Sequence, residues 1–254
     1  MAALLALGGI AHADPIVPNV RPVTIGAPTA GEPSLDSILG CLFLAGYSAC
    51  DPMTTSLSYS ASGNQTGTGL WGTFGGSSSA TLNFEYTGSA DAVGIWSAEN
   101  TAGPVQKLTI FNPSATGANN GSPTFAGIQF VGNVINVFGP CGAVNCQWGL
   151  TGSNINPNAF GFFITHGLET FYTMDALNPG GYAQALSFTN GVGEWAVAFE
   201  NSTLTNTPDH LGDYNDEVLT LQSVVPAVPE PGSVMLVASG LAVLVRRRRR
   251  SAII

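Results

Sequence analysis

Two stretches indicate the fold class of this chain: Thr81-Leu-Asn-Phe-Glu-Tyr86 and Glu217-Val-Leu-Thr-Leu-Gln222. Each partly alternates apolar and polar residues, as a strand does when one face packs on a core and the other faces water. Similar short apolar runs, separated by turn residues, predict further strands. The predicted strands are 54–60, 80–86, 92–97, 105–111, 124–131, 134–138, 161–165, 183–189, 194–200 and 217–224. Their spacing predicts an all-β antiparallel sandwich of jelly-roll type over residues 34–225.

Composition supports this class and excludes others. With 32 Gly, 16 Pro and only 9% charged residues, the chain lacks the charged faces that long amphipathic helices need, so we do not expect a helical bundle. Residues 63–79 are rich in Gly, Ser and Thr and predict a long loop. Before residue 246 only Arg21 and Lys107 are basic, against all 16 acidic residues. A body this acidic is repelled by nucleic acid, so we expect no nucleic-acid partner.

The N-terminal residues have the pattern of a secretory signal peptide over 1–13. An apolar run too short to span a bilayer is followed by Ala11-His12-Ala13, a small-residue pattern that precedes signal-peptidase cleavage. We expect cleavage after Ala13 and export of the chain. Residues 14–33 hold five prolines and no hydrophobic periodicity, and predict a flexible leader.

Residues 226–254 combine three features in a fixed order: a Pro-Glu-Pro motif, an apolar stretch at 233–245 and five arginines at 246–250. Prolines are excluded from helix interiors, so a short hydrophobic helix is expected only after them. The arginines stay on the cytoplasmic side of the membrane and leave the body outside. A helix over 233–245 would reach ~20 Å, less than a ~30 Å hydrocarbon core, which favours a temporary anchor.

This tail resembles the PEP-CTERM sorting signal. The resemblance rests on Val228, Pro229, Glu230, Pro231 and Gly232, and on the later Arg246, Arg247, Arg248, Arg249 and Arg250. It implies an exosortase-type membrane protease as partner, a transient inner-membrane anchor, and delivery to the cell surface or the extracellular space. It also implies a non-enzymatic surface or matrix protein associated with exopolysaccharide or biofilm. A secreted carbohydrate-binding protein or carbohydrate-active enzyme on the same sandwich is the alternative.

Four cysteines form two local pairs, Cys41 with Cys50 and Cys141 with Cys146. Three connectivities are open from sequence. Export places the thiols in an oxidising compartment, so we expect both local pairs to be disulfides. A zinc site is the poorer alternative, because zinc pairs are more closely spaced and accompanied by further Cys or His.

The order of motifs in the C-terminal half carries a second resemblance. Four segments resemble, in order, an uncharacterised Asp-rich β-domain found upstream of such tails, over residues 149–225. They are Phe160-Gly-Phe-Phe-Ile-Thr165, Phe171-Tyr-Thr-Met-Asp-Ala-Leu-Asn-Pro-Gly-Gly181, Trp195-Ala-Val-Ala-Phe-Glu200 and Gly212-Asp-Tyr-Asn-Asp-Glu-Val-Leu219. The resemblance implies a β-fold but no activity.

Oxygen ligands are dense where the chain enters the last predicted strand. They are Asp209, Asp213, Asn215, Asp216 and Glu217. Calcium takes six to eight oxygens, and closely spaced carboxylates repel one another unless a cation or water screens them. We therefore expect calcium here, with Asp175, Asn178 and Glu200 as candidates to complete the shell, and no other cofactor. Turn capping by Asp and Asn side chains is the alternative.

No catalytic motif accompanies these features. The sequence has no Gly-x-Ser-x-Gly, no His-Glu-x-x-His and no phosphate-binding Gly-rich loop. His166 and His210, the histidines beyond the signal peptide, are expected to be polar loop residues. Four tryptophans could stack on sugars, but core packing is their commoner role: Trp71, Trp96, Trp148 and Trp195.

Overall fold

The protein is described here by a computed structural model. It describes residues 21–46, 50–75, 77–85, 91–97, 106–111, 124–131, 134–138, 147–151, 155–202 and 212–227. These residues lie in one compact unit, Val17–Ala227. They form antiparallel sheets with little helix, which confirms the predicted all-β class. The predicted signal peptide and the predicted C-terminal hydrophobic helix lie outside the described residues.

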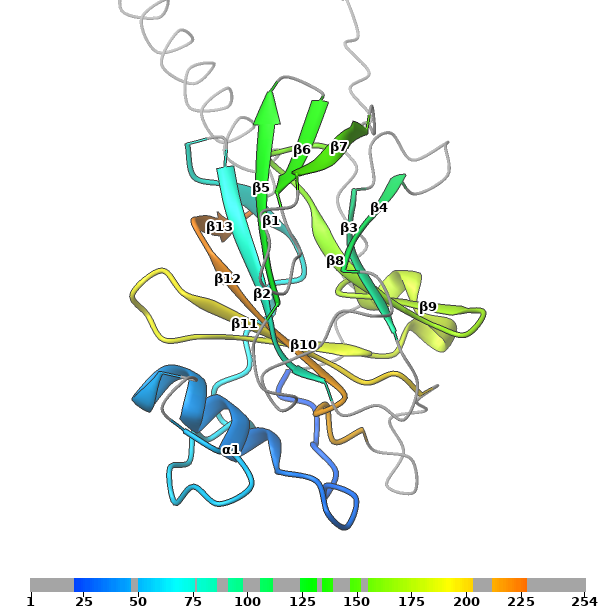
Figure 1. The fold of residues 1–254 in the computed structure, drawn as a ribbon. Helices are drawn as coiled ribbons and strands as arrows, with labels where there is room; N and C mark the ends of the chain where they lie inside the picture. The colour runs from blue at the N-terminus through cyan, green and yellow to red at the C-terminus, as the bar shows by residue number, and fades with distance from the viewer. Residues whose placement is uncertain are drawn as a thin grey trace, which may run out of the picture. The chain divides into compact units, whose positions relative to one another are not determined.

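The larger sheet has seven strands in the order β10-β11-β12-β2-β5-β6-β7, and each neighbouring pair is antiparallel. Their bounds are β10 (Ala185–Thr189), β11 (Trp195–Phe199), β12 (Glu217–Gln222), β2 (Ser77–Glu85), β5 (Thr124–Val131), β6 (Val134–Phe138) and β7 (Gln147–Thr151). Strands β2, β5, β6 and β7 lie between residues 77 and 151, whereas β10, β11 and β12 lie between residues 185 and 222, so the β12–β2 pair joins an early part of the chain to a late one (Figure 1).

A second sheet has four strands in the order β4-β3-β8-β9. Their bounds are β4 (Gln106–Phe111), β3 (Ala92–Ser97), β8 (Gly161–His166) and β9 (Glu169–Tyr172). Two further strands, β1 (Trp71–Thr73) and β13 (Val224–Pro226), pair antiparallel as a ribbon. Short helical turns lie in the loops: the π turn η1 (Cys41–Ala45) and the 3-10 turns η4 (Asp175–Leu177) and η5 (Pro179–Gly181).

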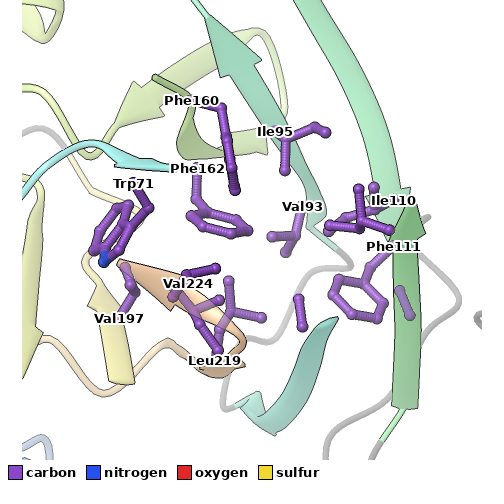
Figure 2. Close-up of a cluster of buried hydrophobic side chains, with 14 of the residues drawn as sticks. Trp71, Val93, Ile95, Ile110, Phe111, Phe160, Phe162, Val197, Leu219 and Val224 are labelled. Carbon is purple, nitrogen blue, oxygen red and sulfur yellow. The ribbon is translucent and has the colours of Figure 1, made fainter. Parts of the chain in front are cut away.

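The two sheets and the ribbon share one hydrophobic core. Figure 2 shows Val93 and Phe162 of the smaller sheet, Leu219 of the larger sheet, and Trp71 and Val224 of the ribbon with their side chains turned toward one another. All of these side chains are buried. Burial of such apolar surface contributes about 1.5–3 kcal/mol for each large side chain, so this core is the main source of stability for the sandwich.

A second core lies on the other face of the larger sheet, under helix α1 (Leu35–Gly40). Strand β11 shows how one sequence serves both cores. Trp195, Val197 and Phe199 enter the sandwich core, while Ala196 and Ala198 face the helix side. Because both faces are buried, the strand is a continuous apolar run and does not alternate with polar residues. Small alanines on the helix side leave room for the large side chains of α1.

Helix α1 begins at a capped N-terminus. The hydroxyl of Ser34 accepts a hydrogen bond from the backbone N–H of Ser37, which satisfies one of the donors that a helix start leaves unpaired. Gly40 ends the helix where the chain passes the backbone of Leu57, and a Cβ at position 40 would lie 2.8 Å from that backbone. Glycine is therefore the residue that this close approach allows.

The structure differs from the sequence predictions in several places, and strands β7 and β9 are among the elements that were not predicted. Residues 54–60 form no strand, because they run beneath α1, where Tyr59 packs on the second core and its backbone N–H donates to Asp36. The predicted loop at 63–79 contains β1 and the start of β2. Helix α1 was not predicted at all, since its six residues are too short to show a helical period.

Candidate functional site: a buried carboxyl cluster

The candidate site forms where β11 ends and β12 begins. Antiparallel pairing places Phe199 opposite Glu217, so the residues just after β11 lie beside those just before β12. The carboxylate of Glu200, a buried side chain, accepts the backbone N–H groups of Asp213 at 3.1 Å and Tyr214 at 3.5 Å. Tyr214 has a φ of 55° in the left-handed region, which lets consecutive N–H groups point at one anion.

Asp216 lies against the same carboxylate. Burial, the negative charge of Glu200 and a side-chain hydrogen bond between the two carboxyl groups raise the pKa of Asp216 to about 8. A hydrogen bond of 2.8 Å from the backbone N–H of Asn201 to Asp216 Oδ2 acts in the opposite direction. A direct bond between two carboxyl groups needs a proton on one of them, and the raised pKa of Asp216 keeps a proton on this residue at neutral pH.

Asp213 is the third carboxyl group of the cluster. Burial, then the charges of Glu200 and Glu32, raise its pKa to about 6, against hydrogen bonds from the backbone N–H groups of Asn215 and Thr29. The Thr29 N–H lies 3.3 Å from Asp213 Oδ2. Glu200, Asp213 and Asp216 are called the carboxyl cluster below.

Residues 21–33, called the N-terminal strap below, are held against the body, although the sequence predicts a flexible leader over 14–33. The side-chain amide of Gln65 makes two hydrogen bonds to the strap. Its oxygen accepts from the backbone N–H of Val23, and its nitrogen donates to the carbonyl of Val23, each at 2.8 Å. Arg21 forms an ion pair with Asp175 at 3.1 Å. These long-range contacts involve single polar side chains, which no local hydrophobic pattern reveals.

A second polar group adjoins the carboxyl cluster through Asn201. Its side-chain amide donates to Asp91 Oδ2 at 3.2 Å, and Asp91 Oδ1 contacts His166 Nδ1 at 2.7 Å. Asp91 precedes β3 and His166 ends β8, so the contact joins neighbouring strands at one end of the smaller sheet. His166, expected to be a polar loop residue, instead ends a strand and pairs with a buried aspartate.

The predicted metal ligands are only partly brought together. Asp213 and Asp216 meet at Glu200, as proposed for the shell, while Asp209 lies outside the described residues. The amide nitrogen of Asn215 donates to Glu32 and Pro33, and the Asn215 side chain is buried. Glu217 is fully buried in β12.

Asp175 and Asn178, the two other residues expected to complete the calcium shell, are engaged in other contacts. Asp175 binds Arg21, and the Asn178 side chain closes the turn after β9 by bonding both backbone groups of Tyr172. Within the described ranges, no three His, Cys, Asp or Glu side chains are arranged to hold a metal ion. Sequence analysis missed Glu32 and Asp91 as neighbours of the site, because each lies more than a hundred positions from the residues it approaches.

Some of the remaining sequence predictions concern described residues, and others concern residues outside the described ranges. The Cys41–Cys50 disulfide is present, and it fastens η1 to the loop that follows. Cys141 and Cys146 lie outside the described residues, as does His210. Trp71, Trp96 and Trp195 are buried core residues, so none of these three presents an open ring to a sugar. Among the described residues, no helix is long and apolar enough to cross a membrane.

Comparison with known proteins identifies the tail. A family model described as the PEP-CTERM protein-sorting motif matches residues 227–250. No curated protein and no solved structure matches the chain. The matched residues begin directly after β13 and include the Pro-Glu-Pro motif and the arginine run. By its tail, the chain is therefore an exported, transiently membrane-associated protein that is sorted through a PEP-CTERM motif by an exosortase-type membrane enzyme.

Proposed function

We propose that the protein is a non-enzymatic component of the cell surface or extracellular matrix, released by exosortase processing and associated with surface polysaccharide. The observation that carries this proposal is the PEP-CTERM motif at 227–250, placed directly behind a folded β-sandwich. Such a tail delivers the body in front of it, so the sandwich is the part that acts outside the cell.

The use of polar residues in the body supports a structural role. Glu200 binds two backbone N–H groups, Asn178 closes a turn, and Gln65 fastens the N-terminal strap. Glu200 and Asn178 are buried, and buried polar groups engaged in this way rigidify a fold. A durable scaffold outside the cell benefits from such internal ties and from the Cys41–Cys50 disulfide.

Fractionation tests this function. A chain tagged after the predicted signal peptide is expressed with and without the exosortase, and the cell-surface and medium fractions are analysed by intact mass. We expect a tail-less form outside the cell only when the exosortase is present. Export of a chain that still contains residues 233–254 would refute the sorting step. In a strain without surface polysaccharide, we expect the released form to move from the surface to the medium.

We also propose weak calcium binding at the carboxyl cluster, in competition with the proton of Asp216. Support comes from the closeness of Asp213 and Asp216 to Glu200, and from the buried Asn215 Oδ1, which accepts no hydrogen bond within the described part of the chain. These carboxyl groups are not arranged as a preformed metal site, so the proposal requires them to shift when calcium binds. Extracellular calcium modules bind at about 10⁻⁴–10⁻³ M. At a hundred times Kd, such binding adds about 2.7 kcal/mol to the free energy of unfolding.

Competition between calcium and a proton predicts that calcium binding depends on pH, and this dependence tests the proposal. With 10 mM calcium, the melting temperature should rise by several degrees at pH 9 and by much less at pH 6, where the cluster holds its proton. Magnesium should have a smaller effect, because it demands a tighter octahedral site. Asp213→Asn should remove the calcium effect, while Asp51→Asn, an exposed aspartate elsewhere, should keep it. Equal melting temperatures with and without calcium at pH 9 would refute the proposal.

A further inference from the structure

The ribbon of β1 and β13 holds the end of the body up to its last described residue. Thr73 is opposite Val224, Gly72 opposite Val225 and Trp71 opposite Pro226. The pairing extends one step beyond the strands at each end. The N–H of Phe74 donates to the carbonyl of Ser223 at 2.9 Å, and the N–H of Ala227 donates to the carbonyl of Leu70 at 3.0 Å. Ala227 is therefore still part of the paired structure.

Strand β1 is itself fastened to the body on its other edge. Trp71 and Phe160 exchange two backbone hydrogen bonds, of 2.7 and 2.8 Å, and the N–H of Thr73 donates to Pro157 at 2.8 Å. The Trp71 side chain is fully buried, and Val224 is 3% exposed in the same core. Peeling β13 away would therefore break backbone hydrogen bonds and expose apolar core surface together.

The backbone properties of Ser223 and Pro226 are compatible with their places beside and in this ribbon. Ser223 has a φ of 58° in the left-handed region, and this kink turns the chain out of β12 and toward β1. Pro226 has no N–H, but it lies opposite Trp71, whose carbonyl accepts from Phe160 and whose N–H donates to Phe160, on the edge away from the ribbon. The missing donor therefore costs no hydrogen bond in the ribbon.

The sorting motif starts where this pairing ends. The matched family model begins at residue 227, and Val228-Pro229-Glu230-Pro231-Gly232 follows at once. A protease must accommodate the backbone on both sides of the bond that it cuts, so it acts on chain that is not paired with other strands. Paired backbone up to Ala227 leaves no free spacer between the fold and the motif.

We infer that the β1–β13 ribbon shields the chain through Ala227, so that exosortase processing of the folded precursor falls at or beyond Val228 and the mature protein keeps β13. This inference rests on the proposed sorting by the exosortase. The step breaks one peptide bond. Its carbonyl carbon passes to a water or amine acceptor, which loses a proton, and the departing amine of the tail takes up a proton. The mature fold would then keep the whole β1–β13 ribbon ahead of its new C-terminus.

The first test is the C-terminal residue of the processed protein, determined by intact mass and C-terminal peptide mapping. We expect the last residue to be Val228 or a later one. A released chain that ends at or before Ala227 would overturn the inference while leaving exosortase sorting intact. An exported chain that keeps its whole tail would overturn the proposed sorting, and the inference with it.

The second test asks whether the ribbon is the shield. The full-length chain in detergent is digested with a broad-specificity protease, and the C-terminal limit of the resistant fragment is measured by mass. Val224→Ser removes a buried side chain from β13, whereas Val225→Ser changes a neighbour that is 43% exposed. Wild type and Val225→Ser should be trimmed no further than Ala227. In Val224→Ser the limit should move upstream, toward Ser223.

Near-ultraviolet circular dichroism checks that the body is folded in both variants, so that a change in the protease limit reports on the ribbon alone. The inference fails if protease trims the wild-type chain past Ala227. It also fails if Val224→Ser keeps the wild-type limit, because protection would then not come from the ribbon.

Discussion

The carboxylate of Glu200 accepts a hydrogen bond from the backbone N–H of Asp213 at 3.1 Å. This contact joins the end of β11 to the segment that leads into β12. The Asp213 carboxylate in turn accepts from Thr29 of the N-terminal strap. Through these two bonds, segments from both ends of the described chain meet at one partly buried group of carboxylates, and this arrangement makes stability sensitive to protons.

Stability should fall as the solution becomes alkaline. The pKa of Asp213 is raised from 3.8 to about 6 and that of Asp216 from 3.8 to about 8, in both cases first by burial. The folded chain therefore holds protons that the unfolded chain releases. The stabilisation is complete below about pH 4 and is lost as the pH rises through about 6 and then about 8. Urea unfolding at pH 7 and pH 9 should show a lower free energy of unfolding at pH 9.

A conservative variant isolates the group responsible. Asp216→Asn keeps an acceptor for Asn201 and a donor for Glu200 but has no proton to lose. It should be more stable than wild type at pH 9 and show a flatter dependence on pH. Asp51→Asn, at an exposed turn, should keep the wild-type slope. Parallel slopes for Asp216→Asn and wild type would show that Asp216 is not the titrating group.

Loss of the Cys41–Cys50 disulfide should destabilise the body. The bond closes a loop with a sequence separation of 9, for which the chain-entropy relation gives about 2–3 kcal/mol. The double substitution Cys41→Ala/Cys50→Ala should lower the urea midpoint accordingly. The matched double substitution Cys141→Ala/Cys146→Ala provides a comparison for the second predicted pair. If the first double variant unfolds at the wild-type midpoint, the bond contributes nothing to stability.

The ion pair between Arg21 and Asp175 should help to hold the N-terminal strap. Their side chains are 17% and 11% exposed, and Arg21 also donates to the carbonyl of Ala185 at 3.3 Å. Arg21→Met should cost about 1.5–3 kcal/mol, as is typical of hydrogen bonds to charged groups. A double-mutant cycle with Asp175→Asn measures the coupling between the two residues. Additive effects of the two substitutions would argue against a direct contribution of the pair.

Gly94 should not tolerate a larger residue. The ring of Phe163, on the neighbouring strand β8, lies against it, and a Cβ at position 94 would meet both this ring at 2.5 Å and the carbonyl oxygen of Leu108. Because the Leu108 contact is with backbone, Gly94→Ala should destabilise the body by about 1–3 kcal/mol. Gly67→Ala is the matched control, since nothing lies within 4 Å of a Cβ there. Thermal unfolding of the two variants checks the difference, and equal melting temperatures would contradict it.

Most strands could be predicted from sequence because short apolar runs between turn residues are a local property. The predicted strands at 92–97, 124–131 and 134–138 match β3, β5 and β6 at both ends. The failures occurred where tertiary contacts override local pattern. Strand β1 lies in a Gly- and Ser-rich stretch and is formed by its partners β13 and Phe160. Residues 54–60, in which Leu57 and Tyr59 alternate with polar residues, contact α1 and do not join a sheet.

The all-β class, the Cys41–Cys50 pair and the sorting tail could all be predicted from sequence, since each depends on composition or on residues close together in the chain. The carboxyl cluster and the N-terminal strap depend on contacts that form only when the chain folds. Asn215 meets Glu32 across 183 positions, and Asn201 meets Asp91 across 110. Such contacts follow from the order in which strands pair, and no local period encodes that order. Burial then raises the pKa values of Asp213 and Asp216, an effect that exists only once the surrounding side chains have excluded water.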